Sequence, residues 1–456
     1  MTHTSTAAVT PEQIAARIER LPLSPWHLRL RVIMGIALFF DAFDALAIAY
    51  VLPVLIGMWK LAPSQIGLLI SAGFAGQLVG AIFFGWLAER IGRIPGAIWT
   101  IAIFSVFSIV CAFSWSFGSM LVFRFIQGLG LGGEVPIAAA YIGEIAKADR
   151  RGRFFLLYQV VFAVGLAAVA VAATWIVPHL GWQWMFYVGA VPAVIALVLR
   201  RTLPESPRWL ASRGRLDEAD RTLRAIEDEV TKTSGQALPA LPSDVPPVSA
   251  SRARWGELFS SLYARRTFAV WVMWFCSYLV TYGIAGWLPT VYRTVFKLPV
   301  QQALQYTMVT PVVGVVAALA CAYFIDVTGR KAWFAVAFLV GSLPLFVLSL
   351  GAAGSALNVM ILSTLSWFFI TTISLGLYLY SAEIYPTRMR ALGTGTGTAW
   401  LRLASIIGPF VVGMILPAGG LGGVFLMFAI ASLVGGVVTA LFGMETRGRI
   451  LEQLSP

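Results

Sequence analysis

The chain has 456 residues, of which 59% are hydrophobic and only 12% are charged, and it carries a net charge of +12. A soluble domain has about 25% charged residues, so this composition excludes an ordinary soluble protein. The chain has no Gly-x-x-x-x-Gly-Lys-Ser/Thr loop, which argues against an ATP-driven pump. Its three cysteines and three histidines form no metal-ligand or disulfide pattern, and we expect neither a metal nor a cofactor.

Apolar runs of about 20 residues recur along most of the chain, and each is long enough to cross a bilayer as a helix. The first run is too long, and begins too far from the N-terminus, to belong to a signal peptide. We predict an all-α membrane protein with twelve transmembrane helices, at residues 31–57, 64–88, 95–115, 118–146, 153–177, 182–201, 267–291, 302–325, 332–351, 356–384, 390–416 and 421–443.

The lysines and arginines indicate how these spans are oriented. Of the 33, 28 lie in segments on the same side as the N-terminus, three lie in the opposite loops and two lie deep within spans. Cytoplasmic loops of membrane proteins carry such an excess of basic residues. We therefore expect a multi-pass protein of the inner or plasma membrane with both termini cytoplasmic, and the positive charge requires no nucleic-acid partner.

A polar stretch divides the spans into two sets of six. It is expected to contain a helix from Leu216 to Val230, followed by a flexible linker rich in proline, serine and alanine. The predicted organisation is an N-terminal cytoplasmic segment, a six-helix bundle, a cytoplasmic central loop, a second six-helix bundle and a cytoplasmic tail, at residues 1–30, 31–201, 202–266, 267–443 and 444–456.

The two bundles share charged motifs at their inner ends. Glu89 is followed four residues later by Arg93, and Asp326 is followed in the same way by Arg330. Further acids and arginines repeat in nearly the same frame, at offsets of 237 to 240 residues: Glu144 and Arg151 with Glu383 and Arg390, and Glu205 with Glu445. This duplication predicts two pseudo-symmetric bundles with a charged cluster at the inner end of each.

Five ionisable residues lie well inside the predicted spans: Asp41, Asp44, Arg124, Glu134 and Arg402. Each costs about 2.5–3.5 kcal/mol to insert, so each is a candidate functional residue, with a structural ion pair between helices as the alternative. Asp41 and Asp44 share one helix face, and at about 1.5 Å per residue Asp44 and Arg124 reach similar depths. Arg402 has no acid of its own bundle at its depth, and a guanidinium facing a cavity can hold a carboxylate.

These motifs resemble the major facilitator superfamily over essentially the whole chain. The string Pro-Glu-Ser-Pro-Arg-Trp-Leu at 204–210 and the Glu-(x)6-Arg loops resemble its sugar-porter-like branch, which includes organic-ion transporters, aromatic-acid symporters and synaptic-vesicle glycoproteins. A closer resemblance, to bacterial niacin (nicotinate) transporters, is carried by residues 17–22, 39–44, 128–136 and 402–409. It implies the major facilitator fold, with a substrate site between the bundles near mid-membrane.

The resemblance also implies roles for the charges inside the spans. Asp44 and Arg124 are similar to the Asp–Arg couple of proton-coupled sugar porters, with Asp44 as proton carrier and Arg124 as its tuner. Asp41 and Glu134 are reserve carriers, and the glycines before Glu134 predict close packing of its helix. Arg402 matches a charge-selecting position of organic-ion transporters and is expected to hold the substrate carboxylate. Its pairing with Asp41 or Asp44 in the empty protein is the alternative.

The charged clusters at the inner ends are expected to bridge the bundles as a cytoplasmic gate. The alternative is that they only fix topology and loop shape. Glu89 stands where the superfamily more often has Asp, and Ile94 and Pro95 replace its usual trailing basic residues, so we expect a weaker gate in the N-terminal half than is typical of the family. The predicted gating residues are Glu89, Arg93, Glu144, Arg151, Asp326, Arg330, Glu383 and Arg390.

The seventh span carries aromatic residues on one helix face, at Trp271, Trp274, Phe275, Tyr278 and Tyr282. Such a stripe packs a core more often than it lines a site, and the alternative is that part of it stacks on a planar ring. This span has no Asn or Gln, where sugar porters have several, so an aromatic carboxylate suits it better than a hexose. Further candidates for substrate contact are Tyr378, Trp400 and Gln159.

We therefore predict a monomeric symporter for a proton and a small aromatic carboxylate, best matched by nicotinate, that works by alternating access. The alternatives are a symporter for benzoate- or hydroxybenzoate-type acids, a sugar or polyol porter, and a transporter-like sensor. No nucleophile–base or metal constellation points to an enzyme.

Overall fold

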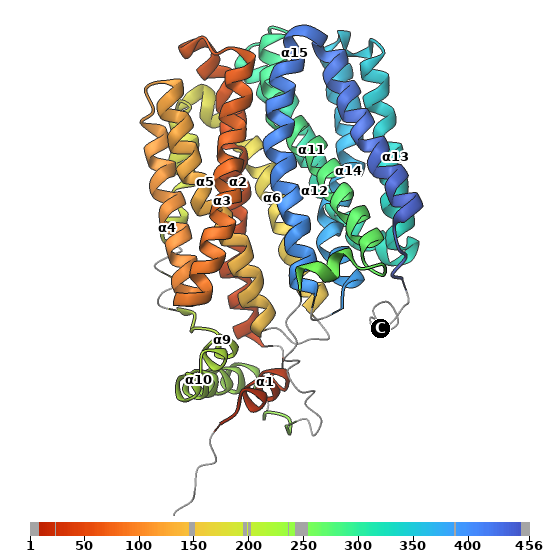
Figure 1. Ribbon diagram of the computed structural model, residues 1–456. Helices are drawn as coiled ribbons and strands as arrows, with labels where there is room; N and C mark the ends of the chain where they lie inside the picture. Colours follow the sequence, from red (N-terminus) through yellow and green to blue (C-terminus); the bar gives the residue numbers. More distant parts are fainter. Residues whose placement is uncertain are drawn as a thin grey trace, which may run out of the picture.

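The computed structural model describes residues 9–22, 24–145, 151–194, 198, 202–235, 237–241, 254–386 and 389–447, and for residues 151–159, 326 and 391 only the course of the backbone. Within those residues, ten helices are long and apolar enough to cross a membrane. They stand side by side in one bundle (Figure 1). Helices are the expected element because a chain that crosses a bilayer must satisfy its backbone polar groups within the segment itself.

The first helices form the N-terminal half of the molecule, red-orange to yellow in Figure 1. Pro25 and Pro63 open its first two long helices, and proline suits a first turn because that turn needs no N–H of its own. The first five helices lie within six residues of the predicted spans, and the sixth span, at 182–201, extends beyond the described residues. The helices are α2 (Pro25–Trp59), α3 (Pro63–Ile91), α4 (Arg93–Ala112), α5 (Phe117–Ile145), α6 (Arg151–His179) and α7 (Gln183–Gly189).

The remaining long helices form the C-terminal half, green to blue in Figure 1. Its last helix, α15, has 53 residues, which would extend about 80 Å against an apolar bilayer thickness of about 30 Å. Gly420, with φ 59°, breaks it into two spans near the predicted ranges 390–416 and 421–443. The elements are η2 (Trp255–Phe259), α11 (Ala264–Thr294), α12 (Val300–Thr328), α13 (Arg330–Ser349), η3 (Ala352–Gly354), α14 (Ala356–Ile384) and α15 (Arg390–Phe442).

Glycines allow α3 and α5 to pack backbone against backbone. A Cβ on Gly76 would lie 2.0 Å from the carbonyl oxygen of Phe125, and one on Gly132 would lie 2.1 Å from that of Gln77. Any larger side chain at these positions would push the two helices apart. The predicted close packing of the glycine-rich stretch before Glu134 is confirmed.

The two halves meet closely at one end of the bundle, where α3 packs against α15. A Cβ on Gly67 would lie 2.7 Å from the carbonyl oxygen of Pro409, and one on Gly413 would lie 2.6 Å from that of Pro63. These glycines therefore seal the halves together at the end where α3 begins, which is the upper end in Figure 1.

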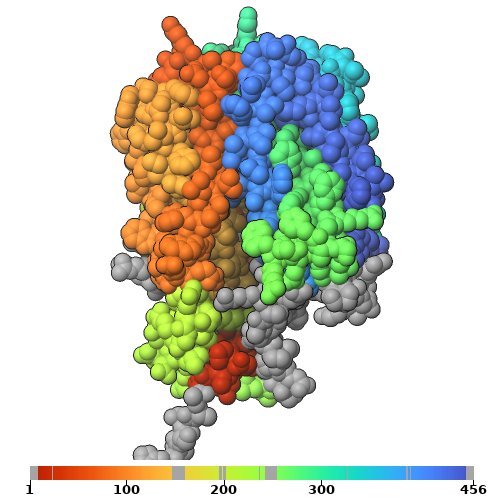
Figure 2. Space-filling view, viewed as in Figure 1, coloured from red at the N-terminus to blue at the C-terminus, as the bar shows by residue number. Residues whose placement is uncertain are grey.

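Three short helices form a cap module below the N-terminal half: α1 (Pro11–Glu19), α9 (Pro207–Ser212) and α10 (Leu216–Ser234). Figure 2 shows this module, red and yellow-green, beneath the orange helices and away from the green and blue ones. The predicted central helix is confirmed within α10. Helix α1 was not expected, although the sequence contains its capping box, in which Thr10 and Gln13 satisfy each other's backbone N–H groups.

Ion pairs hold α1 on α10. Arg17 bonds to Asp220 at 2.5 Å and to Glu227 at 2.6 Å, and Arg20 bonds to Glu227 at 2.7 Å. Burial would raise the pKa of Glu227, but the hydrogen bonds and charges of Arg17 and Arg20 outweigh it and lower that pKa below its ordinary value. The N-terminal segment is thereby fixed to the loop that joins the two halves.

Candidate functional site

Asp44 lies on α2 inside the N-terminal half and is 0% exposed. Ser108 donates to its Oδ1 at 3.3 Å, and Gln127 donates to its Oδ2. Arg124 donates to the side-chain oxygen of Gln127 at 2.7 Å and to the backbone carbonyls of Asp44 and Ala45 at 3.2 and 3.3 Å. Arg124 and Asp44 are therefore brought together as predicted, but Gln127 links their side chains.

Gln127, Ser108 and Gly189 were not recognised from the sequence as parts of this cluster. Gln127 is three residues after Arg124 and so lies on the same helix face, which is a signal that the sequence does carry. A Cβ on Gly189 of α7 would lie 2.7 Å from both Asp44 Oδ1 and Ser108 Oγ. The absence of a side chain at Gly189 makes room for the Asp44 carboxylate.

Asp41 and Glu134 are also buried in the N-terminal half, at 4% and 2% exposure. Their carboxyl groups interact electrostatically with each other. Neither oxygen of Glu134 has a hydrogen-bond partner within the described part of the chain, and the same holds for Oδ1 of Asp41. The two reserve acids are thus close together, and among the described residues no hydrogen bond joins them to the cluster around Asp44, although Asp41 interacts electrostatically with Asp44.

Arg402 lies on α15 and reaches across to the other half, where it donates a hydrogen bond to Gln77 of α3. It interacts electrostatically with Asp41 on α2 and with Tyr278 and Tyr282 on α11. Its guanidinium therefore lies between the halves and beside the aromatic stripe of α11. It is near Asp41, one of the two acids predicted to pair with it in the empty protein.

The aromatic stripe of α11 divides into buried and half-buried residues. Trp274 and Tyr278 are buried, stack with ring centroids 5.5 Å apart, and donate to Ser381 Oγ and to the Ser374 carbonyl of α14. Tyr282 is buried as well and contacts Phe74 of the N-terminal half, with ring centroids 4.6 Å apart. The buried part packs α11 against α14 and, through Tyr282, reaches the other half.

The half-buried members are Trp271 and Phe275, which contact Trp400 of α15 at centroid distances of 5.5 and 6.0 Å. Tyr378 of α14 is also half-buried, and its ring is perpendicular to that of Trp274, with the centroids 4.7 Å apart. These rings have surface available for another planar group. The side chain of Gln159 lies outside the described residues.

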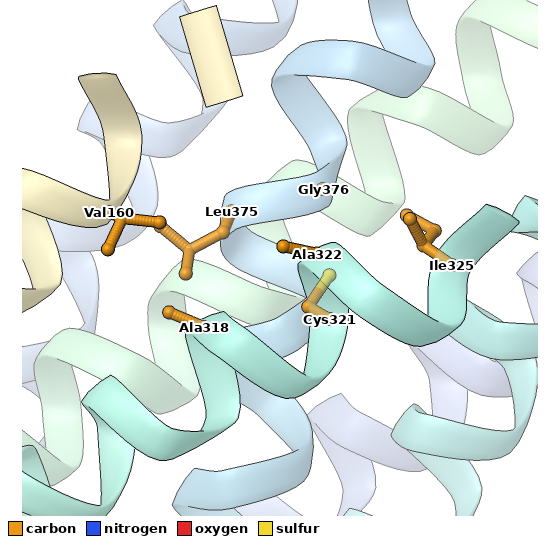
Figure 3. A pocket seen from close by; sticks show the side chains of 7 residues that line it. All are labelled: Val160, Ala318, Cys321, Ala322, Ile325, Leu375 and Gly376. Atoms are coloured by element: carbon orange, nitrogen blue, oxygen red, sulfur yellow. The ribbon is translucent and has the colours of Figure 1, made fainter. Parts of the chain in front are cut away.

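A small pocket lies between α6 of the N-terminal half and helices α12 and α14, and Figure 3 shows its side chains. Among the residues that the structure describes, its lining includes none of the predicted site residues and no charged group that could bind a carboxylate. Its lining residues are Val160, Ala318, Cys321, Ala322, Ile325, Leu375 and Gly376.

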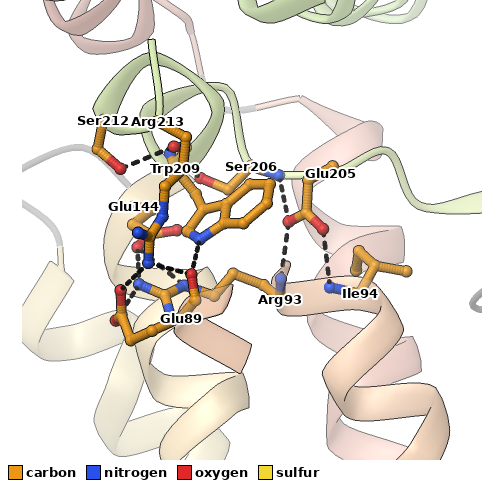
Figure 4. Close-up of polar contacts among 9 residues, drawn as sticks. All are labelled: Glu89, Arg93, Ile94, Glu144, Glu205, Ser206, Trp209, Ser212 and Arg213. Atoms are coloured by element: carbon orange, nitrogen blue, oxygen red, sulfur yellow. Dashed lines mark hydrogen bonds and ion pairs between the residues drawn. The ribbon is translucent and has the colours of Figure 1, made fainter. Parts of the chain in front are cut away.

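The charged clusters at the inner ends pair within their own halves. Arg93 bonds to Glu89 at 2.7 Å and to Glu144 at 2.8 Å, as Figure 4 shows, and Arg330 bonds to Glu383 at 3.1 Å. The side chains of Arg151 and Asp326 lie outside the described residues, and Arg390 begins α15. These ion pairs of Arg93 and Arg330 each lie within one half, and bridging between the halves remains a prediction.

Two glutamates close these clusters by capping helices, a role that the repeated sequence did not reveal. Glu205 accepts from the backbone N–H groups of Arg93 and Ile94, at 3.0 and 3.3 Å, and thus caps α4 (Figure 4). Glu445 accepts in the same way from the first two N–H groups of α13, at 2.9 and 3.1 Å. A carboxylate at a helix N-terminus satisfies free N–H groups and opposes the positive end of the helix dipole.

Glycines are required beside both caps. Gly92 has φ 113° and Gly329 has φ 89°, a backbone region that residues with a Cβ rarely adopt. A Cβ on Gly92 would lie 2.2 Å from Glu205 Oε2, and one on Gly329 would lie 2.6 Å from Glu445 Oε2. In each Gly-Arg pair of the repeated motif, the glycine leaves space for the capping carboxylate and the backbone N–H of the arginine donates to it.

Two packed halves of membrane-spanning helices, with Arg402 and Asp41 where they meet and a repeated charged motif at one end of each, define a membrane transporter. The chain belongs to the sugar (and other) transporter family, whose model matches residues 34–456. Its fold is similar to that of the xylose transporter XylE from E. coli in a partially occluded inward-open conformation, with a TM-score of 0.75 and 19% identity over 94% of this chain and 100% of that one. This is the major facilitator fold that the sequence motifs predicted.

Relatives of higher identity cover nearly the whole chain. The niacin transporter NiaP of Acinetobacter baylyi is 33% identical over 97% of this chain and 99% of its own length. A putative niacin/nicotinamide transporter NiaP of Bacillus subtilis is 30% identical over 93% and 98%. A gallate transporter of Pseudomonas putida is 26% identical over 90% of both chains.

Proposed function

We propose that this chain is a proton-coupled transporter that takes up nicotinate by alternating access. Arg402 carries the proposal, because its guanidinium lies between the halves beside Tyr278 and Tyr282. A cation that can hold a carboxylate, placed beside aromatic rings, suits a flat aromatic acid. The two relatives named as niacin transporters support the same substrate.

Proton coupling removes an electrical penalty. Moving one anion inward against an inside-negative potential is opposed by about 2.3 kcal/mol per 100 mV, and one proton carried with it cancels that charge. Asp44 is the proposed carrier. Arg124 is its proposed tuner, because it contacts the backbone of Asp44 and shares Gln127 with the Asp44 carboxylate.

The proposal includes an arrangement in the membrane. Twelve spans form two six-helix bundles, at residues 31–201 and 267–443, and both termini are cytoplasmic in a monomer of the plasma membrane that performs no covalent chemistry. The excess of lysine and arginine on the side of the N-terminus supports this orientation. The charged clusters with Arg93 and Arg330 then lie on the cytoplasmic side, where they would exchange partners within each half for contacts between halves as that side closes.

The test is a binding panel on the purified protein, with nicotinate, nicotinamide, 4-hydroxybenzoate and xylose. Nicotinate should bind, and nicotinamide, which lacks the carboxylate, should bind at least about tenfold more weakly, a difference of about 1.4 kcal/mol. Arg402→Gln should abolish this preference, whereas Arg402→Lys should retain part of it. Equal binding of nicotinate and nicotinamide would refute the role of Arg402. Tighter binding of 4-hydroxybenzoate would favour the second candidate, an aromatic-acid symporter, which the gallate relative supports.

A further inference from the structure

Asp41 and Glu134 have no part in the function proposed above, although both are buried within the bundle. Asp41 is 4% exposed and Glu134 is 2% exposed. Within the described residues, both oxygens of Glu134 and Oδ1 of Asp41 lack a hydrogen-bond partner. Buried polar atoms of this kind cost free energy, and natural proteins leave few of them unpaired. An acid with a purely structural role would be hydrogen-bonded, so we infer that Asp41 and Glu134 have a functional role.

Asp41 faces the cation of the opposite half. It interacts electrostatically with Arg402, and Tyr282 interacts with both of them. Tyr282 contacts Phe74 across the interface, and Arg402 donates a hydrogen bond to Gln77. These independent contacts place Asp41, Arg402 and Tyr282 at one junction between the halves. Asp41 is thus the acid positioned to balance the charge of Arg402 when no substrate is bound.

Glu134 lies beside Asp41, and their carboxyl groups interact electrostatically. An ionised carboxylate without a hydrogen-bond donor is far costlier to bury than a neutral acid, so Glu134 is best accommodated as the neutral acid. A neutral carboxyl group has one O–H donor. A hydrogen bond from Glu134 to the carboxylate of Asp41 would therefore give a partner to the hydroxyl oxygen of Glu134 and to Oδ1 of Asp41.

We propose that Asp41 is the counter-ion of Arg402 in the empty transporter, that the substrate carboxylate displaces it, and that Glu134 then holds the displaced carboxylate by a hydrogen bond. This inference rests on the proposed role of Arg402 in binding substrate. No covalent bond is made or broken. Arg402 exchanges one carboxylate for another, and the proton of Glu134 stays on Glu134 in the new hydrogen bond.

The exchange links substrate binding to proton binding. Once displaced, Asp41 keeps its negative charge one helical turn from Asp44, with which it interacts electrostatically. That charge attracts a proton to Asp44, whose other charged neighbour is Arg124. Binding of the substrate anion thus favours protonation of Asp44, and this proton is the one transported with the substrate. Asp41 and Glu134 act in this scheme as positioning residues.

The test measures nicotinate binding to the purified full-length protein by calorimetry in buffers of different ionisation enthalpy, which reports proton uptake. Wild type should take up about one proton per nicotinate near neutral pH. Asp41→Asn leaves Arg402 without a competing carboxylate, so it should bind nicotinate about fivefold or more tightly and take up far fewer protons. Glu134→Leu removes the donor and should weaken binding by a similar factor, whereas Glu134→Gln keeps an N–H donor and should bind like wild type.

Unchanged affinity and proton uptake in Asp41→Asn would overturn the counter-ion exchange and leave nicotinate transport standing. Failure of wild type to bind nicotinate would instead overturn the proposed function. In that case acetate, a small carboxylate, tests the exchange in place of nicotinate. In Asp41→Asn the carboxylate that balances the charge of Arg402 is missing, so acetate can take that place. Acetate should raise the Tm of Asp41→Asn more than that of wild type, and not that of Asp41→Asn/Arg402→Gln. Equal shifts in all three proteins would overturn the inference.

Discussion

At the scale of single residues, Asp44 is the residue whose two roles can be separated by substitution. Asp44→Asn keeps the size of the side chain, and its amide can accept from Gln127 and donate to the hydroxyl oxygen of Ser108, but it cannot carry a proton. A gradient of one pH unit can drive about tenfold accumulation of substrate. We expect Asp44→Asn to abolish that accumulation and to retain the exchange of nicotinate across the membrane, measured in proteoliposomes with and without the gradient.

Exchange serves as the internal control in this experiment, because it requires binding and alternating access but no net proton movement. If Asp44→Asn still accumulates nicotinate against a gradient, another acid is the carrier. If exchange is lost together with accumulation, the contacts of Asp44 are needed for the structure itself.

Gly189 is the residue that gives Asp44 its space. In Gly189→Ala the new Cβ would lie 2.7 Å from Asp44 Oδ1 and Ser108 Oγ, and such overpacking costs about 1–3 kcal/mol. We expect a lower Tm and weaker proton-driven uptake of nicotinate. Gly143→Ala is the matched control, because a Cβ there meets nothing within 4 Å. Equal melting of the two variants would show that the site tolerates the extra methyl group.

At the scale of helices, the two capping glutamates occupy equivalent places, but their pKa values are shifted in opposite directions. Burial raises the pKa of Glu205 above its ordinary value, and the hydrogen bonds that it accepts offset only part of this. Burial would raise the pKa of Glu445 too, but four backbone N–H groups outweigh it and lower that pKa. A carboxyl group whose pKa is lowered by folding stabilises the fold at a pH above its ordinary pKa. A carboxyl group whose pKa is raised by folding destabilises the fold at the same pH.

The two caps should therefore respond differently to the same substitution. At neutral pH we expect Glu445→Gln to lower stability by about 1 kcal/mol, as the loss of a good helix cap does, and Glu205→Gln to lower it less. The effect of Glu445→Gln should shrink as the pH falls below the ordinary pKa of a glutamate, and it should disappear once the pH falls below the lowered pKa of Glu445 in the folded protein. Thermal unfolding in detergent across this pH range measures both variants. Equal losses at neutral pH would contradict the difference between the caps.

The helices themselves could be predicted from the sequence, because in a bilayer length and apolarity decide the element. Contacts such as the link through Gln127 could not, since they depend on how two helices rotate and approach each other. Helix α1 was missed because its apolar face, with Ile14 and Ile18, is buried against residues two hundred positions away. Its capping box was visible in the sequence, but a helix of nine residues is not stable alone.

At the scale of the whole molecule, the candidate site is complete only when both halves contribute to it. The N-terminal half supplies the acids Asp41, Asp44 and Glu134, and the C-terminal half supplies Arg402 and the aromatic stripe. A movement of one half against the other must therefore change the distance between Arg402 and the acids. This arrangement makes the contact between α3 and α15 a determinant of which conformation is populated.

Gly67 and Gly413 are the residues that permit this contact, because a Cβ at either would lie within 2.7 Å of a backbone oxygen of the opposite half. Backbone atoms cannot move aside as a flexible side chain can, so the double variant Gly67→Ala/Gly413→Ala should disfavour the conformation sealed at this end. We expect spin labels on the adjacent ends of α3 and α15 to move apart, and uptake to fall about tenfold or more, with nicotinate binding retained. Gly57→Ala is the control, because a Cβ there meets nothing within 4 Å. Unchanged label distances in the double variant would show that the seal does not select the conformation.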